Sequence, residues 1–210
     1  LNQWNILFKD NSDLIFLGKD VKTNKSSPHN FILMKNKKLV DLYIDTFKDN
    51  KIDNIFELGI RRGGSVAFYN LAFRPSRHTA IDLSIDIVSA LKDVIELAKA
   101  EKRSLSTHYG VDQANRSRVL SICEKVFDYG DGNMQPLDFV VDDASHRQKP
   151  TEVAFETLFP LLREDGLYAI EDWGWAHWAN YQGPNAYFAD EPALTNTIFK
   201  LLILHTCRPD

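Results

Sequence analysis

The chain has 210 residues, of which 44% are hydrophobic and 26% charged, an ordinary globular composition that can bury a core without disulfides. Twenty-nine acidic residues against 25 basic ones give a net charge of −4, which disfavours a nucleic-acid-binding surface. The two cysteines provide no disulfide framework. No apolar run approaches the length of a membrane span, and no signal peptide is visible. We therefore expect a cytoplasmic protein without a nucleic-acid or membrane partner.

The first 50 residues have a mixed pattern and are expected to form an N-terminal extension or lid. Short apolar patches at 6–8 and 14–17 precede a polar stretch at 23–30 that reads as a loop. Apolar residues from Leu39 to Phe47 then recur at the spacing of an amphipathic helix.

From residue 54 onward, short apolar runs alternate with helical patterns. The runs expected to be strands are 55–60, 79–83, 105–109, 137–141 and 167–170, and the helices between them are 65–74, 85–100, 114–127 and 151–163. This alternation predicts an α/β fold, a Rossmann-like doubly wound and mostly parallel sheet with right-handed crossovers. In such a sheet, ligands bind at the carboxyl ends of the strands.

The first predicted strand ends in a glycine-containing turn, which runs from Glu57 through Gly59 and Gly63 to Ser65. Glycines allow a sharp turn and a close approach of a ligand, and the next helix offers free N–H groups at its start. The spacing departs from G-x-G-x-x-G and so argues against NAD. Glu57 suits a cationic or amine-bearing ligand better than an anion. A plain strand–helix turn is the alternative.

Polar side chains also follow the second and third predicted strands. Asp82 lies about 20 residues beyond the glycine turn, where an acid can hydrogen-bond a ribose diol, and capping the next helix is compatible with that role. Asp112 and Gln113 present hydrogen-bonding groups suited to an adenine edge. For this strand taken by itself, capping of the helix from Ala114 is the better interpretation.

Paired acids end the fourth and fifth predicted strands, Asp142-Asp143 and Glu171-Asp172. Four carboxylates at one sheet edge raise each other's pKa, and a divalent cation removes that cost. Oxygen ligation by few protein groups suits Mg²⁺. Neighbouring strand residues point to opposite faces, so one Asp of the first pair is expected to cap a helix or face solvent.

His146 and an aromatic segment complete the candidate site. His146 follows Asp143 by three residues and is a candidate general base, with a structural hydrogen bond as the alternative. Residues 172–188 carry three of the four tryptophans and His177, which is placed to contact a substrate. Such a segment fits a lid or substrate wall. Packing against the N-terminal segment or a partner subunit is an equal alternative.

Together these motifs resemble class I S-adenosylmethionine-dependent methyltransferases. The turn at 57–65 is similar to the first motif of the metal-dependent O-methyltransferase branch. Residues 142–146 with 171–172 are similar to the macrolide-sugar O-methyltransferases of the mycinamicin and macrocin type, and to the cephalosporin hydroxylase-like family that shares their core. The resemblance covers residues 54–173.

The resemblance implies S-adenosylmethionine and Mg²⁺ as cofactors. It implies that Asp143, Glu171 and Asp172 hold the metal and that His146 is the base. The residues expected to bind S-adenosylmethionine are Glu57, Gly59, Gly63, Ser65, Asp82, Asp112, Gln113 and Asp142.

The activity implied is methyl transfer to a hydroxyl of a small molecule, such as a natural-product sugar or polyketide. The alternatives are a cephalosporin hydroxylase-like or other Rossmann-fold enzyme, or a non-catalytic domain of a larger biosynthetic assembly. A second copy of the chain, or neighbouring domains of such an assembly, are left open as partners.

One departure from the family concerns the end of the sheet. Such folds usually add two more strands after a further helix, whereas the helical run at 193–204 is followed here by the end of the chain. The chain also begins with leucine. We therefore expect an excised or truncated protein with an extension or lid at 1–50, containing the amphipathic helix, and a methyltransferase domain at 51–210 that lacks its C-terminal strands.

Overall fold

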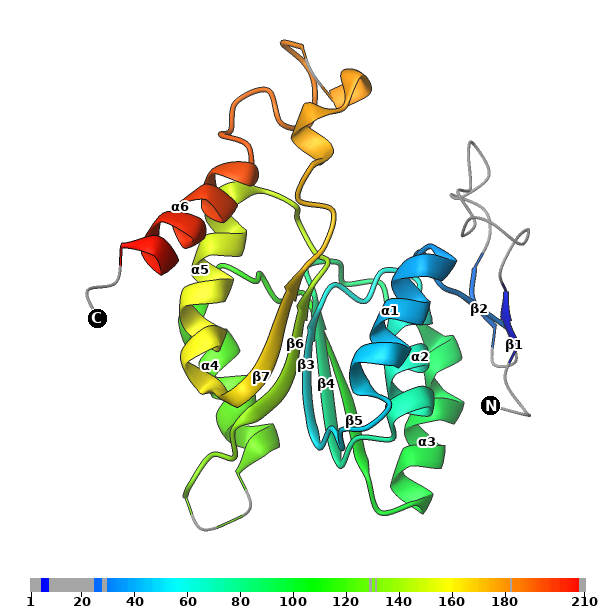
Figure 1. Cartoon of the computed structure of the whole chain (residues 1–210). Helices are drawn as coiled ribbons and strands as arrows, with labels where there is room; N and C mark the ends of the chain where they lie inside the picture. The colour runs from blue at the N-terminus through cyan, green and yellow to red at the C-terminus, as the bar shows by residue number, and fades with distance from the viewer. Residues whose placement is uncertain are drawn as a thin grey trace.

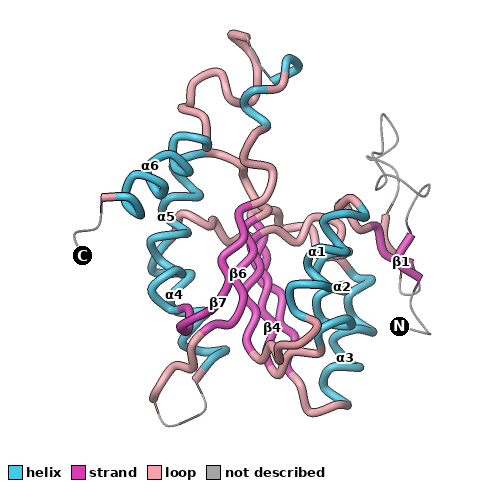
Figure 2. Tube along the Cα trace, viewed as in Figure 1, coloured by secondary structure: helices cyan, strands magenta, loops and turns pink. Residues whose placement is uncertain are grey.

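The computed structural model describes residues 5–7, 25–27, 30–128, 130, 132–181 and 183–207. The apolar patch expected at 14–17, and part of the loop expected at 23–30, lie outside these residues. In the described part, helices cover both faces of a central sheet (Figure 1). Figure 2 shows the same three layers, with the strands in the middle. This is the α/β architecture that the alternating pattern predicts.

The central sheet contains five strands, each parallel to its neighbours. They are β3 (Asn54–Leu58), β4 (Arg77–Asp82), β5 (Ser104–Tyr109), β6 (Leu137–Asp142) and β7 (Leu162–Ile170). Their order across the sheet is β5-β4-β3-β6-β7, which confirms the predicted doubly wound arrangement. The order reverses between β3 and β6, and such sheets bind ligands beyond the carboxyl ends of the strands at this switch point.

The helices divide between the two faces of the sheet. On one face lie α1 (Lys37–Phe47), α2 (Gly64–Phe73) and α3 (Lys92–Ala100), and on the other lie α4 (Arg116–Phe127) and α5 (Gln148–Leu158) (Figure 1). The last helix, α6 (Thr195–Thr206), packs outside α5. Because helices cover both faces of the sheet, the central strands β3 and β6 are buried at every residue.

The helix predicted at 85–100 begins later than its apolar pattern indicates. A short 3-10 turn at Ser89–Leu91 leads into α3, and residues 85–88 form a loop. The Ser84 hydroxyl accepts a hydrogen bond from the backbone N–H of Asp86, at 3.0 Å, and such side-chain contacts compete with helix formation. Ile85 and Ile87, which the prediction placed in this helix, are therefore 81% and 76% exposed.

The helix predicted at 151–163 is shifted toward the N-terminus. It begins at Gln148, and Pro150 does not prevent this because proline is tolerated in the first turn of a helix. It ends at Leu158, just before Pro160, and a 3-10 turn at Phe159–Leu161 leads directly into β7. The strand predicted at 167–170 thus starts five residues earlier, at Leu162.

Apolar residues between Phe31 and Tyr43 pack on the same core as the sheet. Strands β1 (Asn5–Leu7) and β2 (Asn30–Ile32) form a small parallel sheet, and α1 confirms the predicted amphipathic helix. Val40 and Tyr43 of α1 are buried, and the Tyr43 ring lies 5.5 Å from that of Phe139 in β6. A side chain at Gly64 would meet the Ile32 carbonyl at 2.1 Å, so the start of α2 approaches β2 closely only because it is a glycine.

Beyond β7, the chain leaves the carboxyl end of the sheet and projects away from it before returning to α6 (Figure 1). This stretch, residues 172–194, includes the aromatic residues predicted at 172–188 and is called the aromatic segment from here on. It contains two 3-10 turns, Trp175–His177 and Ala179–Tyr181. Among the described helices, none has the length and apolar character needed to cross a bilayer.

Candidate functional site

The turn after β3 brings the ends of two central strands into direct contact. Gly59 has a φ of +101°, and a side chain there would lie 2.4 Å from the Asp143 carbonyl oxygen beyond β6. Gly63 also has a positive φ, of +78°, and ends the turn just before α2. Ser65 lies in the first turn of α2. The glycines predicted from the sequence are therefore required by the backbone at the switch point itself.

Two of the four acids predicted near the cofactor, Glu57 and Asp82, occupy different environments. Glu57 is 1% exposed, and its carboxylate lies 3.1 Å from Nε2 of the buried His78 on β4. Asp82 at the end of β4 is half-buried, and its Oδ2 accepts the backbone N–H groups of Ile60 and Arg61 at 2.8 Å each. Its Oδ1 accepts the N–H of Ser84 at 2.8 Å. Asp82 therefore fixes the glycine turn against the end of β4.

Asp112 and Gln113 follow β5, and each side chain bonds within the protein. The Asp112 carboxylate accepts the N–H of Ala114 at 2.8 Å, but α4 begins at Arg116 and is capped by Asn115, so Asp112 bonds within the preceding turn and does not cap the helix. Gln113 is buried, and its Nε2 donates to Asp142 Oδ2 at 3.1 Å. Its Oε1 accepts the backbone N–H of Ser145 at 3.0 Å. Gln113 thereby links the end of β6 to the loop that carries His146.

Asp142 is the buried member of the first acid pair. Its side chain is 2% exposed, and burial together with the charge of Asp143 raises its pKa to about 7. A carboxyl group in this position binds a proton much more readily than an exposed one. Of the two adjacent acids, Asp143 is the more accessible, with 23% of its side chain exposed.

An ammonium group that the sequence did not reveal lies between the two acid pairs. Lys35, in the segment between β2 and α1, places Nζ 2.8 Å from Asp143 Oδ2 and 2.6 Å from Glu171 Oε2. The hydroxyl of Tyr43 on α1 donates to Glu171 Oε1 at 2.8 Å. The N-terminal segment thus supplies two partners to the acidic cluster, which we define as Asp143, Glu171 and Asp172.

These contacts shift the pKa values of the groups involved. Burial by itself would lower the pKa of Lys35, but the carboxylates of Asp143 and Glu171 raise it above its usual value. Burial raises the pKa of Glu171, and the ammonium of Lys35 opposes that shift. Burial and the charge of Glu171 also raise the pKa of Tyr43, so its hydroxyl remains protonated and donates.

A second grouping, which includes His146, has the composition of a metal site. One ligand atom each from Asp143, His146 and Asp172 lie within 4.8 Å of one another. Nε2 of His146 lies 4.0 Å from Asp143 Oδ1, the carboxylate oxygen that Lys35 does not contact. Burial raises the pKa of Asp172, while the charge of His146 lowers it. The sequence-based metal set shares Asp143 and Asp172 with this group.

His146 and Asp172 both have left-handed backbones, with φ values of +56° and +53°. Such conformations are uncommon for residues other than glycine and tend to occur at functional sites. They turn the chain sharply after β6 and β7, where the two side chains enter the group with Asp143.

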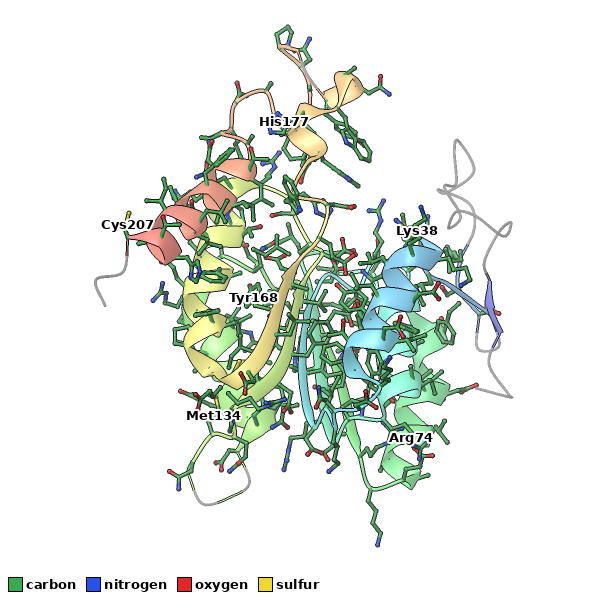
Figure 3. The ribbon with its side chains drawn as sticks, in the orientation of Figure 1. Lys38, Arg74, Met134, Tyr168, His177 and Cys207 are labelled. Carbon is green, nitrogen blue, oxygen red and sulfur yellow. The ribbon has the colours of Figure 1, made fainter. Side chains whose placement is uncertain are left out.

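The aromatic segment covers one side of this group. The Trp175 ring lies 4.4 Å from that of His146 and 5.5 Å from that of Tyr181. The base of the segment is held to the body of the protein by the Arg147–Glu191 ion pair at 2.8 Å. His177, labelled in Figure 3, bonds the Thr195 hydroxyl at 2.9 Å.

A groove of about 400 Å³ opens beside the acidic cluster, between α1 and the end of β7. Its lining includes Glu171, Asp172 and Trp173, together with Leu39, Leu42, Tyr43, Thr46, Leu167, Ala169 and Ile170. Trp173 is 47% exposed there. The groove is thus lined mostly by apolar residues, with two acidic residues among them.

The sheet order and its flanking helices define the class I methyltransferase fold. The MycE methyltransferase from the mycinamycin pathway, in complex with Mg, SAH and mycinamycin VI, superposes with a TM-score of 0.58 and 23% identity, over 81% of this chain and 42% of that one. An O-methyltransferase from Bacillus cereus in complex with SAH gives 0.52 and 17% identity, over 82% and 69%. At these identities the likeness concerns the fold.

Sequence comparison gives more particular relatives. One relative is an 8-demethyl-8-alpha-L-rhamnosyl tetracenomycin-C 2'-O-methyltransferase from Streptomyces olivaceus. The two sequences are 38% identical in an alignment of 85 residues, which covers 36% of this chain and 22% of the relative. It is 33% identical over 91 residues to the demethylmacrocin O-methyltransferase from Streptomyces fradiae, 43% of this chain and 21% of the relative.

The aligned regions thus span about a fifth of the length of these curated relatives. No family profile matches the chain. The resemblance to sugar O-methyltransferases of the macrocin and mycinamicin type, predicted from the motifs, is confirmed.

Proposed function

We propose that this chain carries the catalytic domain of an S-adenosylmethionine- and Mg²⁺-dependent O-methyltransferase. Its acceptor would be a hydroxyl group of a small natural product, with a sugar hydroxyl favoured. In this proposal, residues 51–210 contribute the methyltransferase domain and residues 1–50 an extension that reaches the site. The supporting observation is that the glycine turn, Asp82 and the acidic cluster all lie at the carboxyl ends of neighbouring parallel strands.

The residues at the switch point fit S-adenosylmethionine. Gly59 and Gly63 allow a ligand to approach the backbone, and the first turn of α2 has unpaired N–H groups near Ser65. The half-buried carboxylate of Asp82 retains lone pairs for a ribose diol beyond its three backbone contacts. Asp112 would approach the adenine. Glu57, Gln113 and Asp142 would support the cofactor site indirectly, because their described polar contacts lie within the protein.

The donor set of Asp143 and Asp172 fits a divalent cation that keeps water or substrate oxygens in its remaining positions. When bound there, Mg²⁺ would lower the pKa of an acceptor hydroxyl and orient it. A vicinal diol would supply two such substrate oxygens.

His146 would accept the proton from the acceptor hydroxyl. Its imidazole is held between the Asp143 carboxylate and the ring of Trp175, so its orientation is restricted. A neutral imidazole is the most common base at neutral pH. Methyl transfer itself then depends on holding the acceptor oxygen in line with the methyl group.

The groove beside α1 is a candidate acceptor site. Its two acidic lining residues, its apolar lining and the exposed ring of Trp173 suit a molecule with a hydroxylated ring and an apolar body, since aromatic faces stack on sugars. The names of the relatives, which refer to a rhamnosyl tetracenomycin and to demethylmacrocin, support a glycosylated natural product.

Two measurements test the proposal. Calorimetry should detect binding of S-adenosylhomocysteine, and NAD in the same assay should give no heat. Methyl transfer from labelled S-adenosylmethionine to a panel of glycosylated macrolides and aromatic polyketides should be abolished by EDTA and restored by Mg²⁺. Turnover that persists without metal would contradict the metal role, and NAD binding in place of S-adenosylhomocysteine would contradict the proposed cofactor.

A further inference from the structure

Lys35 is a deeply buried charged group in the described part of the site. Its side chain is 1% exposed, and its ammonium contacts both Asp143 and Glu171. An isolated buried ammonium is unfavourable, but one held between two carboxylates is compensated. The ring of Tyr69 lies beneath it, 5.9 Å from Nζ. Lys35 is therefore held in place by its surroundings and is not a solvated surface lysine.

Glu171 is engaged on both of its carboxylate oxygens. Oε2 accepts from Lys35 at 2.6 Å, while Oε1 accepts from Tyr43 at 2.8 Å and from Tyr69 at 3.4 Å. Its side chain is only 6% exposed. Asp143, in contrast, uses Oδ2 for Lys35 and directs Oδ1 toward His146. The ammonium of Lys35 thus neutralises Glu171, whereas Oδ1 of Asp143 has no contact with it.

We propose that Lys35 is a built-in cation of the acidic cluster, which withholds Glu171 from metal coordination and leaves Asp143 and Asp172 as the carboxylate ligands. The charges support this division. Three ionised carboxylates and one ammonium leave two negative charges, which a single divalent cation balances. Lys35 is thereby a positioning residue that limits the site to one metal ion. This inference rests on the metal part of the proposed function.

Metal binding measured directly tests this role without any need for turnover. We would titrate the metal-free chain with Mn²⁺ and follow free Mn²⁺ by electron paramagnetic resonance. Lys35→Met removes the charge and keeps most of the length of the side chain. The variant should bind Mn²⁺ at least about tenfold more tightly, because a unit charge within a few ångströms of a poorly solvated cation site changes its affinity by more than that factor.

A double-mutant cycle separates withholding of Glu171 from a general effect of charge. Glu171→Gln should lower Mn²⁺ affinity at least about tenfold more in the Lys35→Met background than in the native chain, since only there is Glu171 free to coordinate. Lys37→Met is the matched control. Lys37 is also a lysine of this segment, but its side chain is 59% exposed and pairs with Asp41, so Mn²⁺ affinity should not change.

The possible outcomes are distinct. Unchanged or weaker Mn²⁺ binding by Lys35→Met, or an equal effect of Glu171→Gln in both backgrounds, would overturn the role of Lys35 and leave the proposed function intact. No Mn²⁺ binding by any variant would overturn both the role of Lys35 and the proposed metal site. If circular dichroism shows that Lys35→Met is unfolded, Lys35→Gln, which keeps a donor for Glu171, is titrated in the same cycle.

Discussion

The side-chain nitrogen of Gln113 lies 3.1 Å from Oδ2 of Asp142, and this hydrogen bond joins the loop after β5 to the end of β6. The oxygen of the same amide accepts the backbone N–H of Ser145. One buried side chain therefore holds both the strand end and the loop that carries His146. The adenine contact predicted for Gln113 from the sequence would be made by a side chain that these hydrogen bonds hold in a fixed position.

Gln113→Leu preserves the volume of this side chain and removes both hydrogen bonds. The buried carboxyl of Asp142 and the Ser145 N–H lose a partner, so we expect a loss of about 1–3 kcal/mol in the free energy of unfolding, measured with urea. Asn50→Leu, at an exposed position, is the control and should change it by less than about 0.5 kcal/mol. Equal stability of Gln113→Leu and the native chain would contradict this account.

Asp142 should make the stability of the protein depend on pH. Its pKa is raised to about 7 from an ordinary value of 3.8, so the folded state holds a proton that the unfolded chain releases. The resulting stabilisation is complete below about pH 4 and is lost as the pH rises to about 7, by at most about 4 kcal/mol. Asp142→Asn should therefore flatten the pH profile of the free energy of unfolding over that interval. Parallel profiles for variant and native chain would show that the group does not titrate there.

Gly59→Ala tests the close approach of β3 and β6. The new side chain would meet the Asp143 carbonyl at 2.4 Å on a backbone with a φ of +101°, and we expect a loss of about 3 kcal/mol or more in the free energy of unfolding. Gly174→Ala is the matched control, because its φ is −89° and a side chain there meets nothing within 4 Å. Similar melting temperatures for the two variants would contradict the predicted clash.

His146→Asn tests the proposed base while respecting the backbone, since asparagine tolerates the left-handed conformation. We expect kcat to fall by about 10²–10⁴-fold with S-adenosylhomocysteine affinity unchanged. His205→Asn, at an exposed position on α6, should retain native kcat. Native turnover in His146→Asn would exclude the imidazole as base, whereas lost cofactor affinity would indicate a structural role.

The parallel sheet is predictable from the sequence because its central strands β3 and β6 are mostly apolar and alternate with helical patterns. The sequence does not predict the first half of β7, where Arg163, Glu164 and Asp165 read as a loop. These polar residues are tolerated because β7 forms the edge of the described sheet. The misplaced start at residue 85 has the converse cause. Ile85 matches a helical stripe, but the Asp82 carboxylate accepts the N–H of Ser84 and the Ser84 hydroxyl accepts the N–H of Asp86, which holds this backbone in a loop.

The acidic residues of the site are also predictable, because parallel strands must end at one edge. The partner of Glu171 is not, because Lys35 lies 136 residues away and belongs to a run that reads as solvated lysines. The left-handed bends at His146 and Asp172 cannot be predicted from the alternation of side chains along a strand. These bends bring the two residues together with Asp143. Only the folded backbone determines which acids face one another.

The left-handed backbones at 146 and 172 have a consequence for protein engineering. Each holds a side chain that would be replaced by glycine at a gain of about 1 kcal/mol if stability were the only criterion. A library selected for heat tolerance alone should therefore enrich glycine at both positions and lose turnover. Selection that alternates between heat and activity should keep histidine and aspartate there and accumulate its stabilising changes elsewhere in the chain.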